Sequence, residues 1–463
     1  MVAGVVTMLS FLSGSMANAS QRYFSFEIGR KDFEQLKKVF SLNLTIFIVI
    51  ALSVLVLSET IGLWFVNTKL VIPAARKNAA QWIYQFSIIS FLFTILTTPY
   101  MASIIAHEDM NIYAYVSIIE AILKLGVVFL LRFIFIDKLQ LYGFLMCAVA
   151  IINTAIYRII CTRKYQECKF SFYWNKPLFK EIASYIGWSL FGNLTSVVRN
   201  QAVTILLNQV FNPVVIAARS IASQINSVVS SFSSNFSTAL QPQIIKSYSS
   251  GQNAEMLHLI SRGSKSTYFL MYLFTLPLVL EMPIILSVWL KNVPDYAVIF
   301  TQLALIDVLI NSISFPLMTA ARATGKVKIY ESVLGSIQIV GFFITWLVVI
   351  LGAPAYSVMI VSICISIIMV IGRLLIVRWL IKFSLKQYFY EAILPACLVT
   401  IVSIILPALL YIILKKSILR LFVVIAVSVF SVCGCMYMLG LNKAERKKIN
   451  ELIINRIHEV KFV

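Results

Sequence analysis

Thirteen apolar segments, each long enough to cross a lipid bilayer, constrain the fold of this chain more than any other feature. A membrane-spanning helix needs about 20 predominantly apolar residues. The segments cover approximately residues 1–25, 40–66, 80–105, 111–135, 139–162, 181–210, 214–240, 262–290, 296–322, 327–352, 355–381, 388–414 and 418–440. Hydrophobic residues make up 60% of the 463, and the mean hydropathy is +0.89, so little of the chain remains for a soluble domain. The sequence therefore predicts an all-α polytopic membrane protein with about 13 transmembrane helices.

The formal net charge of +20 comes from basic residues that are distributed unevenly among the loops. Of the 39 Lys and Arg residues, 27 fall in the C-terminal tail and in one set of alternate loops, and nine fall in the other set. They form no single basic domain of the kind that binds nucleic acid, so we expect no nucleic-acid partner. Loops rich in Lys and Arg face the cytoplasm. This predicts a multi-pass protein of the inner (cytoplasmic) membrane with its C-terminus in the cytoplasm.

An internal repeat relates the two halves of the chain. At an offset of 217 residues, Pro99–Ala106 aligns with Pro316–Ala323 without a gap, and the wider match holds six identities in eighteen columns. At the nearly equal offset of 220, the first apolar segment aligns with residues 214–240. Both pairs lie six spans apart, so the paired helices point the same way and the repeat is parallel. We therefore expect two helical lobes built on one plan.

The repeat divides the chain into five parts. These are an N-terminal lobe at 1–168, an interfacial linker at 169–180, a C-terminal lobe at 181–383, two additional helices at 384–441 and a basic cytoplasmic tail at 442–463. The repeat partner of the helix at 181–210 would lie before residue 1, so only five of six helices are expected in the N-terminal lobe. We expect that the first helix is missing through truncation or a downstream start-codon assignment. A true deviation from the plan is the alternative.

Polar residues inside the apolar segments are informative because lipid offers them no hydrogen bonds. In the segment 214–240, Arg219 and Asn226 share one helical face with several serines. We interpret this face as the wall of a hydrated cavity in which Arg219 binds an anionic group. The alternative is close helix packing through small residues, with Arg219 reaching toward the membrane surface.

The segment 181–210 repeats this pattern. Asn193 and Asn200 lie on one polar stripe of the predicted helix, and both are candidates for the cavity wall. Arg199 lies about 120° from the centre of that stripe by helical spacing. For Arg199, a place in the cavity and a place between packed helices both stay open.

Three further charged residues lie in predicted spans. Glu120 precedes Lys124 by four residues, which is the favourable order for an ion pair along a helix. This pair either contacts the substrate or fixes helix packing. Asp307 is a lone carboxylate in its span, and we expect it to pair with Arg199 or Arg219. Titration of Asp307 during transport is the alternative.

No arrangement of residues in the sequence indicates catalysis. The three histidines lie in loops or in the tail, and no Gly-rich phosphate-binding loop is present. The seven cysteines include no set with the spacing of metal ligands. We therefore expect that the chain is not an enzyme and that it has no catalytic residues, no cofactor and no metal site.

Three motifs carry a resemblance to a known family. They are Ser20–Gly29, Ala217–Gln224 and Gln241–Tyr248. In these motifs the chain resembles the Wzx-type oligosaccharide flippases, which are polysaccharide biosynthesis proteins of the multidrug/oligosaccharidyl-lipid/polysaccharide exporter superfamily. The likeness extends over essentially the whole chain. It implies two six-helix lobes that open alternately to the cytoplasm and to the outside.

The resemblance also implies a substrate and partners. A flippase of this type carries a polyprenyl-diphosphate-linked oligosaccharide across the cytoplasmic membrane for cell-surface polysaccharides such as lipopolysaccharide O-antigen. The family implies a cationic cavity for the diphosphate, and Arg219, Arg199 and Lys124 are the basic residues available for it. The implied partners are the lipid-linked oligosaccharide, membrane lipids and other membrane proteins of polysaccharide assembly.

Two other functions stay open at this point. A cation-coupled small-molecule (multidrug) exporter of the same superfamily would use acidic cavity residues, of which Glu120 and Asp307 are the candidates. A membrane glycan polymerase or ligase would need catalytic residues on a sizeable external loop. The longest external loop, about 67–79, contains no acidic residue and no histidine, so we rank this function last.

Overall fold

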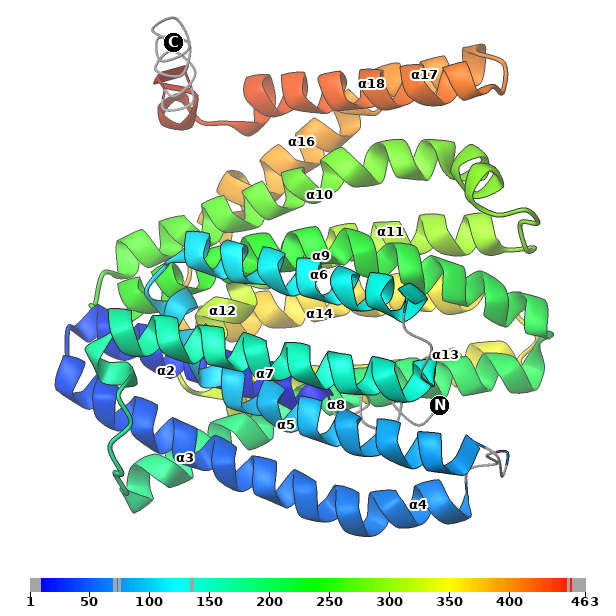
Figure 1. The fold of residues 1–463 in the computed structure, drawn as a ribbon. Coiled ribbons are helices and arrows are strands. Elements are labelled where there is room, and N and C mark those ends of the chain that lie inside the picture. The colour runs from blue at the N-terminus through cyan, green and yellow to red at the C-terminus, as the bar shows by residue number, and fades with distance from the viewer. Residues whose placement is uncertain (1–9, 70–72, 74–75, 134–136, 448–449, 452–463) are drawn as a thin grey trace, which may run out of the picture. The chain divides into compact units, whose positions relative to one another are not determined.

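The computed structural model describes residues 10–69, 73, 76–133, 137–447 and 450–451, and every secondary-structure element among them is a helix (Figure 1). The longer elements are α2 (Ser10–Arg30), α3 (Phe33–Leu57), α4 (Leu63–Thr68), α5 (Lys77–Ala106), α6 (Met110–Phe133), α7 (Lys138–Lys164), α8 (Lys176–Val210), α9 (Pro213–Ser249), α10 (Asn253–Trp289), α11 (Ala297–Ser312), α12 (Phe315–Ala323), α13 (Val327–Ile350), α14 (Ser357–Ile381), α15 (Leu385–Tyr388), α16 (Leu394–Ser403), α17 (Ile405–Ile413) and α18 (Ile418–Cys435). Short π- or 3-10 turns lie at Ser58–Gly62, Gln166–Cys168, Phe389–Ile393 and Met436–Gly440. The predicted all-α fold is confirmed.

Several helices begin at a polar residue whose side chain accepts a hydrogen bond from a free backbone N–H of the first turn. Before α3, Asp32 accepts a hydrogen bond of 2.9 Å from the N–H of Gln35, as its position in the sequence predicts. Before α7, Asp137 accepts one of 2.9 Å from the N–H of Leu139. These caps place the helix starts at the ends of the apolar segments.

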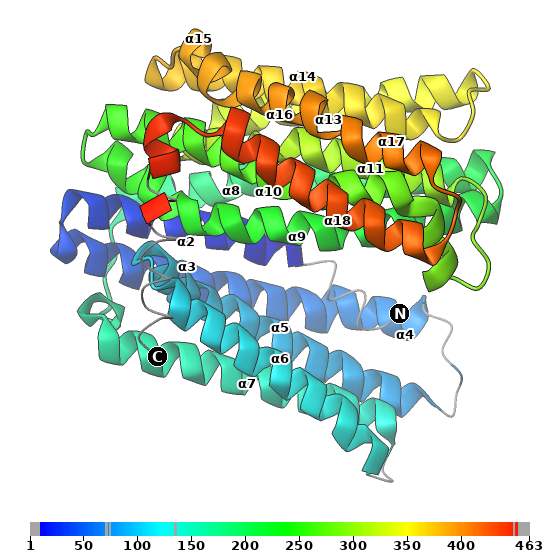
Figure 2. The ribbon, with the colours of Figure 1, turned by 90° about the horizontal axis from the view of Figure 1, so that it is seen from above.

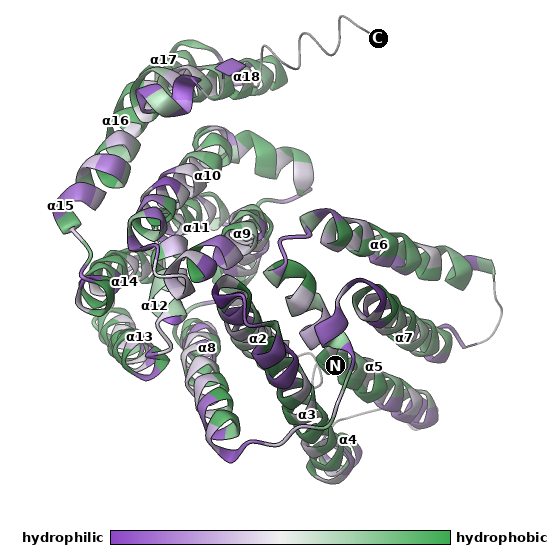
Figure 3. Cartoon of the chain, turned by 90° about the vertical axis from the view of Figure 1, so that its left-hand side faces the viewer, coloured by the Kyte–Doolittle hydropathy of each residue, from purple (hydrophilic) through white to green (hydrophobic). Residues whose placement is uncertain are grey.

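Nine helices among the described residues are long and apolar enough to cross a membrane, and the bent pair of α11 and α12 gives a tenth. They match ten of the thirteen predicted spans. The remaining predicted spans correspond to α2, α8 and α9, with 21, 35 and 37 residues. These helices have sufficient length, but their serines and asparagines lower the hydropathy. Figure 3 shows the contrast, since α8 has white and purple stretches whereas α3 is mostly green. Two of these polar helices, α8 and α9, carry five of the eight candidate site residues.

The described residues form two compact units. The first unit takes the described parts of Met1–Leu194, Gln241–Met256 and Arg322–Ser332. In this unit α5 packs against α2, α3 and α7 (Figures 1 and 2). Aromatic rings fill its core, and the ring of Phe40 lies 5.6 Å from that of Phe24 and 5.5 Å from that of Tyr100. Segments from both sequence repeats therefore belong to one packed body.

The second unit takes the described parts of Thr195–Leu240, Leu257–Ala321 and Val333–Val463. Here α11 packs against α14. The additional helices are joined to α10, because Tyr272 donates to the Thr400 carbonyl at 3.1 Å and Arg420 forms an ion pair of 3.0 Å with the fully buried Glu281 (Figure 2). The predicted boundaries of the two lobes stay a prediction.

Candidate functional site

A polar pocket of about 460 Å³ lies within the second unit. Four helices, α8, α9, α11 and α14, contribute to its wall. The lining residues are Asn200, Gln201, Thr204, Arg219, Ser223, Asn226, Ala304, Asp307, Met359 and Ser362. Four of the eight predicted site residues are thus brought together, namely Arg219, Asn200, Asn226 and Asp307. Three of these residues, Asn200, Arg219 and Asn226, come from the polar helices α8 and α9, whose stripes predicted a cavity wall.

Arg219 provides the positive charge of this pocket. Its Nη2 donates to the backbone carbonyl of Asn200 at 3.3 Å. Its Nη1 is buried and donates to no other part of the described protein. A buried guanidinium N–H without an acceptor is unfavourable, and a bound anion would satisfy it. In this pocket, Nη2 of Arg219 is held by the backbone, and Nη1 can donate to a ligand.

The wall of this pocket also contains a carboxylate, Asp307. Asp307 Oδ1 accepts a hydrogen bond of 2.5 Å from Ser366 of α14, and Ser366 in turn accepts one of 2.9 Å from Asn311. The expected ion pair of Asp307 with Arg199 or Arg219 is not formed, because the serine of the neighbouring helix α14 takes its place. Asp307 therefore faces the pocket as a carboxylate held by neutral groups.

Asn226 of α9 lines the pocket and is hydrogen-bonded to α11 and to a serine of its own helix. Its amide nitrogen donates to the carbonyl of Ala304 at 3.3 Å, and its amide oxygen accepts from Ser230 at 3.2 Å. These two bonds use one donor and the acceptor of the side chain and orient the face of α9 that carries Ser223. Of the serines in α9, Ser223 lines the pocket, whereas Ser230 supports Asn226.

A second pocket, of about 410 Å³, lies within the first unit. Glu120 and Lys124 line it and form an ion pair of 2.6 Å, as their spacing predicts. Asn153 of α7 donates to the other oxygen of Glu120 at 3.1 Å. Tyr113 belongs to the same wall, together with hydroxyl groups from α5 and α6. The wall of this pocket is mostly apolar, and the ion pair leaves it without a net charge.

Two predicted site residues line neither pocket. Arg199 donates to Ser362 at 3.2 Å, and Ser362 lines the pocket that contains Arg219. Asn193 lies in the first unit and donates to Ser15 of α2 at 2.7 Å, which is a contact between packed helices. A role of either residue in the site stays a prediction.

Sequence reasoning missed the partners of these residues. Ser362 and Ser366 lie four residues apart in α14, and Asn153 is an asparagine in the middle of α7. A polar residue in an apolar span indicates a contact with another polar group. Only the fold shows that these three residues contact Arg199, Asp307 and Glu120. Among the described residues, no group of three or more His, Cys, Asp or Glu side chains is arranged to hold a metal ion.

No protein-family model and no curated protein matches this sequence. Solved structures do match the fold. A structure described as the outward-facing conformation of a multidrug resistance MATE family transporter of the MOP superfamily has 10% sequence identity and a TM-score of 0.73, over 82% of this chain and 87% of that chain. The MATE transporter ClbM in complex with Rb⁺ has 13% identity and a TM-score of 0.71, over 84% and 87% of the two chains.

The Vibrio cholerae MATE transporter VcmN in the bent form has 14% identity and a TM-score of 0.64, over 84% of this chain and 90% of that chain. At such low identity the likeness concerns the backbone and not the cargo. The topology nevertheless agrees over more than four fifths of the chain. This chain therefore has the fold of the MATE transporters.

Proposed function

We propose that the chain is an alternating-access transporter of the multidrug/oligosaccharidyl-lipid/polysaccharide exporter superfamily whose cargo carries an anionic group. The substrate that fits best is a polyprenyl-diphosphate-linked oligosaccharide, which is flipped across the cytoplasmic membrane for cell-surface polysaccharide synthesis. The observation that carries this proposal is Arg219, whose buried Nη1 has no acceptor in a pocket of about 460 Å³. The resemblance of the sequence motifs to the flippases agrees with it.

The chemistry of a diphosphate suits this pocket. A guanidinium binds phosphate oxygens through two parallel N–H groups, and such charge-assisted hydrogen bonds are roughly twice as strong as neutral ones. Asn200 and Asn226 line the same pocket and supply further polar groups. The neutral pocket of the first unit, with Glu120 and Asn153 in its wall, offers the donors and acceptors that sugar hydroxyls require.

A second candidate is a cation-coupled exporter of small molecules. The structural neighbours favour this candidate over a flippase, because each of the three named above is a MATE transporter and one is described as a multidrug resistance transporter. Each pocket also has one carboxylate in its wall, Glu120 in the first unit and Asp307 in the second. Such carboxylates would attract an organic cation or a coupling ion.

The two candidates are distinguished in the native host deleted for this gene and complemented with variants. For a flippase, Arg219→Ala should lower surface glycan at least about tenfold, because a charge-assisted hydrogen bond contributes about 1.5–3 kcal/mol. Arg219→Lys should give an intermediate level, since the charge stays but the planar fork is lost. Arg132→Ala, at the exposed end of α6, is the matched control and should change nothing.

The same strains are tested for sensitivity to cationic dyes. If Arg219→Ala leaves surface glycan at the normal level while Glu120→Gln or Asp307→Asn makes the cells dye-sensitive, the flippase proposal is wrong and the exporter is supported. The amount of each variant in the membrane fraction is measured alongside. Localisation in the cytoplasmic membrane, a cytoplasmic C-terminus and contacts with other polysaccharide-assembly proteins are parts of the same proposal.

A further inference from the structure

Two turns of the first unit share a positive φ and a backbone hydrogen bond, and they occupy equivalent places in the sequence repeat. Glu108 lies in the turn between α5 and α6 with a φ of 65°, and Gly325 lies in the turn between α12 and α13 with a φ of 77°. The N–H of Glu108 donates to the carbonyl of Ile105 at 2.9 Å, and that of Gly325 donates to the carbonyl of Arg322 at 3.1 Å. Both pairs are 217 residues apart, which is the offset of the repeat. The two turns are therefore copies of one structure.

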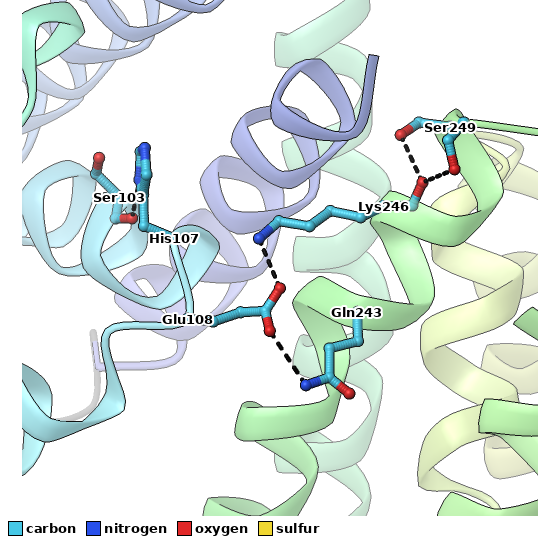
Figure 4. Close-up of polar contacts among 7 residues, drawn as sticks. Ser103, His107, Glu108, Gln243, Lys246 and Ser249 are labelled. Atoms are coloured by element: carbon cyan, nitrogen blue, oxygen red, sulfur yellow. Dashed lines mark hydrogen bonds and ion pairs between the residues drawn. The ribbon is translucent and has the colours of Figure 1, made fainter. Parts of the chain in front are cut away.

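Each of these turns is held by a helix of the other repeat. The turn of the first repeat is held by α9, since Lys246 forms an ion pair of 2.6 Å with Glu108 and Gln243 donates to the other carboxylate oxygen at 3.1 Å (Figure 4). A left-handed conformation is unfavourable for a residue other than glycine, by about 1 kcal/mol or more. Glu108 nevertheless occupies it, and its carboxylate makes both contacts with α9.

The turn of the second repeat is held by α2. Arg22 donates to the carbonyl of Ala323 at 3.3 Å and lies 3.9 Å from the carboxylate of Glu181. A Cβ atom on Gly325 would lie 3.0 Å from Nη2 of Arg22. Glycine at this position thus serves both the positive φ and the close approach of the guanidinium. The two arrangements are reciprocal, because α2 and α9 are themselves repeat partners.

The holding helices also touch each other. A Cβ atom on Gly29, near the end of α2, would lie 2.8 Å from the Cα atom of Lys246 in α9. Nearby, the rings of Phe26 and Tyr248 lie 6.5 Å apart. Two helix ends and two turns therefore form one cluster, which we call the clasp and define as Arg22, Gly29, Glu108, Gln243, Lys246, Ala323 and Gly325.

We propose that the clasp is a latch between the two repeats that closes the end of the transporter predicted to face the cytoplasm, and that it breaks whenever this end opens. The proposal rests on the alternating-access function proposed above. The predicted side follows from the basic loops, to which Arg22, Lys246 and Arg322 belong.

The energetics of the first arm suit a reversible contact. The side chains of Lys246 and Glu108 are 22% and 33% exposed, so water can replace their ion pair at a modest cost. The pair of Arg420 and Glu281 in the second unit is different, since its carboxylate is fully buried and its separation would be costly. A contact that opens in every transport cycle has to be partly exposed, as the pair of Lys246 and Glu108 is, because a buried pair such as Arg420 and Glu281 would be too costly to separate.

The test measures opening directly through a buried position next to the clasp. Ser25 of α2 is fully buried, and its hydroxyl has no partner among the described residues, so Ser25→Cys removes no hydrogen bond. Inverted membrane vesicles are treated with a membrane-impermeant maleimide, and modification at residue 25 is followed by peptide mass spectrometry. Adding Glu108→Gln should speed this modification about tenfold, which corresponds to about 1.4 kcal/mol less stabilisation of the closed state.

Two further variants make the result specific. The charge exchange Glu108→Lys with Lys246→Glu should bring the rate back toward that of Ser25→Cys alone. The matched control is Glu34→Gln, because Glu34 and Lys38 form an ion pair of the same length, 2.6 Å, on the exposed surface of a single helix, α3. It should leave the rate unchanged.

Three results would contradict the proposed latch. If Glu108→Gln leaves the rate at residue 25 unchanged, or if Glu34→Gln raises it equally, the clasp is no latch. If the buried Cys161 of α7 is modified in parallel with residue 25, the variant loosens the whole unit and the latch is again refuted. None of these readouts depends on the cargo, so failure of the proposed substrate leaves the test of the latch intact.

Discussion

Gly192 of α8 occupies a position where a single methyl group should break a buried ion pair. A Cβ atom built on Gly192 would lie 1.9 Å from Oε2 and 2.7 Å from Cδ of Glu331. Glu331 is only 5% exposed, and its Oε1 forms an ion pair of 3.0 Å with Arg322. The carboxylate has no room to keep this position beside an alanine. Gly192→Ala should therefore separate Glu331 from Arg322.

The size of the effect follows from two opposing terms. Breaking a buried ion pair by disturbing one partner costs about 3–5 kcal/mol. Alanine in place of glycine in a helix interior returns about 1 kcal/mol. The net loss of unfolding free energy for Gly192→Ala should thus be about 2–4 kcal/mol, which lowers the folded-to-unfolded ratio at least about thirtyfold.

Gly187, in the same helix, provides a matched control. Apart from its own helix, no atom of the described residues lies within 4 Å of the Cβ that an alanine would place there. Gly187→Ala should therefore stabilise the protein by up to about 1 kcal/mol. Reversible unfolding in mixed micelles, titrated with a denaturing detergent, measures both variants. Equal stability of the two alanine variants would refute the reasoning. In a Glu331→Ala background, Gly192→Ala should change the free energy of unfolding little, because the carboxylate that the new methyl group would meet has been removed.

Two further predictions concern other parts of the fold. Gly29→Ala should destabilise the protein by about 1–3 kcal/mol, since its Cβ would meet the backbone of Lys246 at 2.8 Å. The control is Gly14→Ala, whose Cβ would have no described residue of another element within 4 Å. Equal melting temperatures of the two variants would show that α2 and α9 are not closely packed at Gly29. Burial alone would raise the pKa of Glu445. Hydrogen bonds from Lys265 at 2.7 Å and from the N–H of Asn442 at 2.8 Å, together with the charges of Lys265 and Arg262, outweigh burial and lower the pKa below its usual range. These interactions stabilise the fold fully above the unfolded-state pKa of about 4.3 and are lost as pH falls through the lowered folded-state pKa. The difference in melting temperature between the wild type and Glu445→Gln should be constant from about pH 7 to 5 and shrink below pH 4, whereas a difference that grows on acidification would contradict this assignment.

The helical fold could be predicted because the solvent imposes it. In a bilayer the backbone must satisfy its own hydrogen bonds, so length and apolarity are enough to locate ten of the thirteen spans. The remaining three predicted spans are also helices, α2, α8 and α9, but their serines and asparagines lower their hydropathy. In α9, the helical spacing of the polar residues, such as Arg219 and Asn226, agrees with a helix that has one polar face.

The site could be predicted only as far as one helix determines it. The face of α9 and the ion pair of Glu120 with Lys124 depend on spacing within a single helix, and both are found in pocket walls. The partner of Asp307 depends on which residue of α14 lies opposite, and the sequence contains no measure of that register. Pairing with an arginine was the natural expectation, but Ser366 lies closer.

At the clasp, the structure shows a similarity between the two repeats that the residue types do not show. The alignment pairs Glu108 with Gly325, two residues with no chemical likeness, although identities resume after the turn at Ile112 and Tyr113. Both residues adopt a positive φ, but for different reasons: Gly325 adopts it freely and leaves space for Arg22, whereas Glu108 is held there while its carboxylate binds Lys246 and Gln243. One arm of the clasp is therefore a backbone contact and the other an ion pair. Of the two turns, only that of the first repeat contributes a charged side chain to the clasp, which is why the change that tests the latch is made at Glu108 and not at its repeat partner.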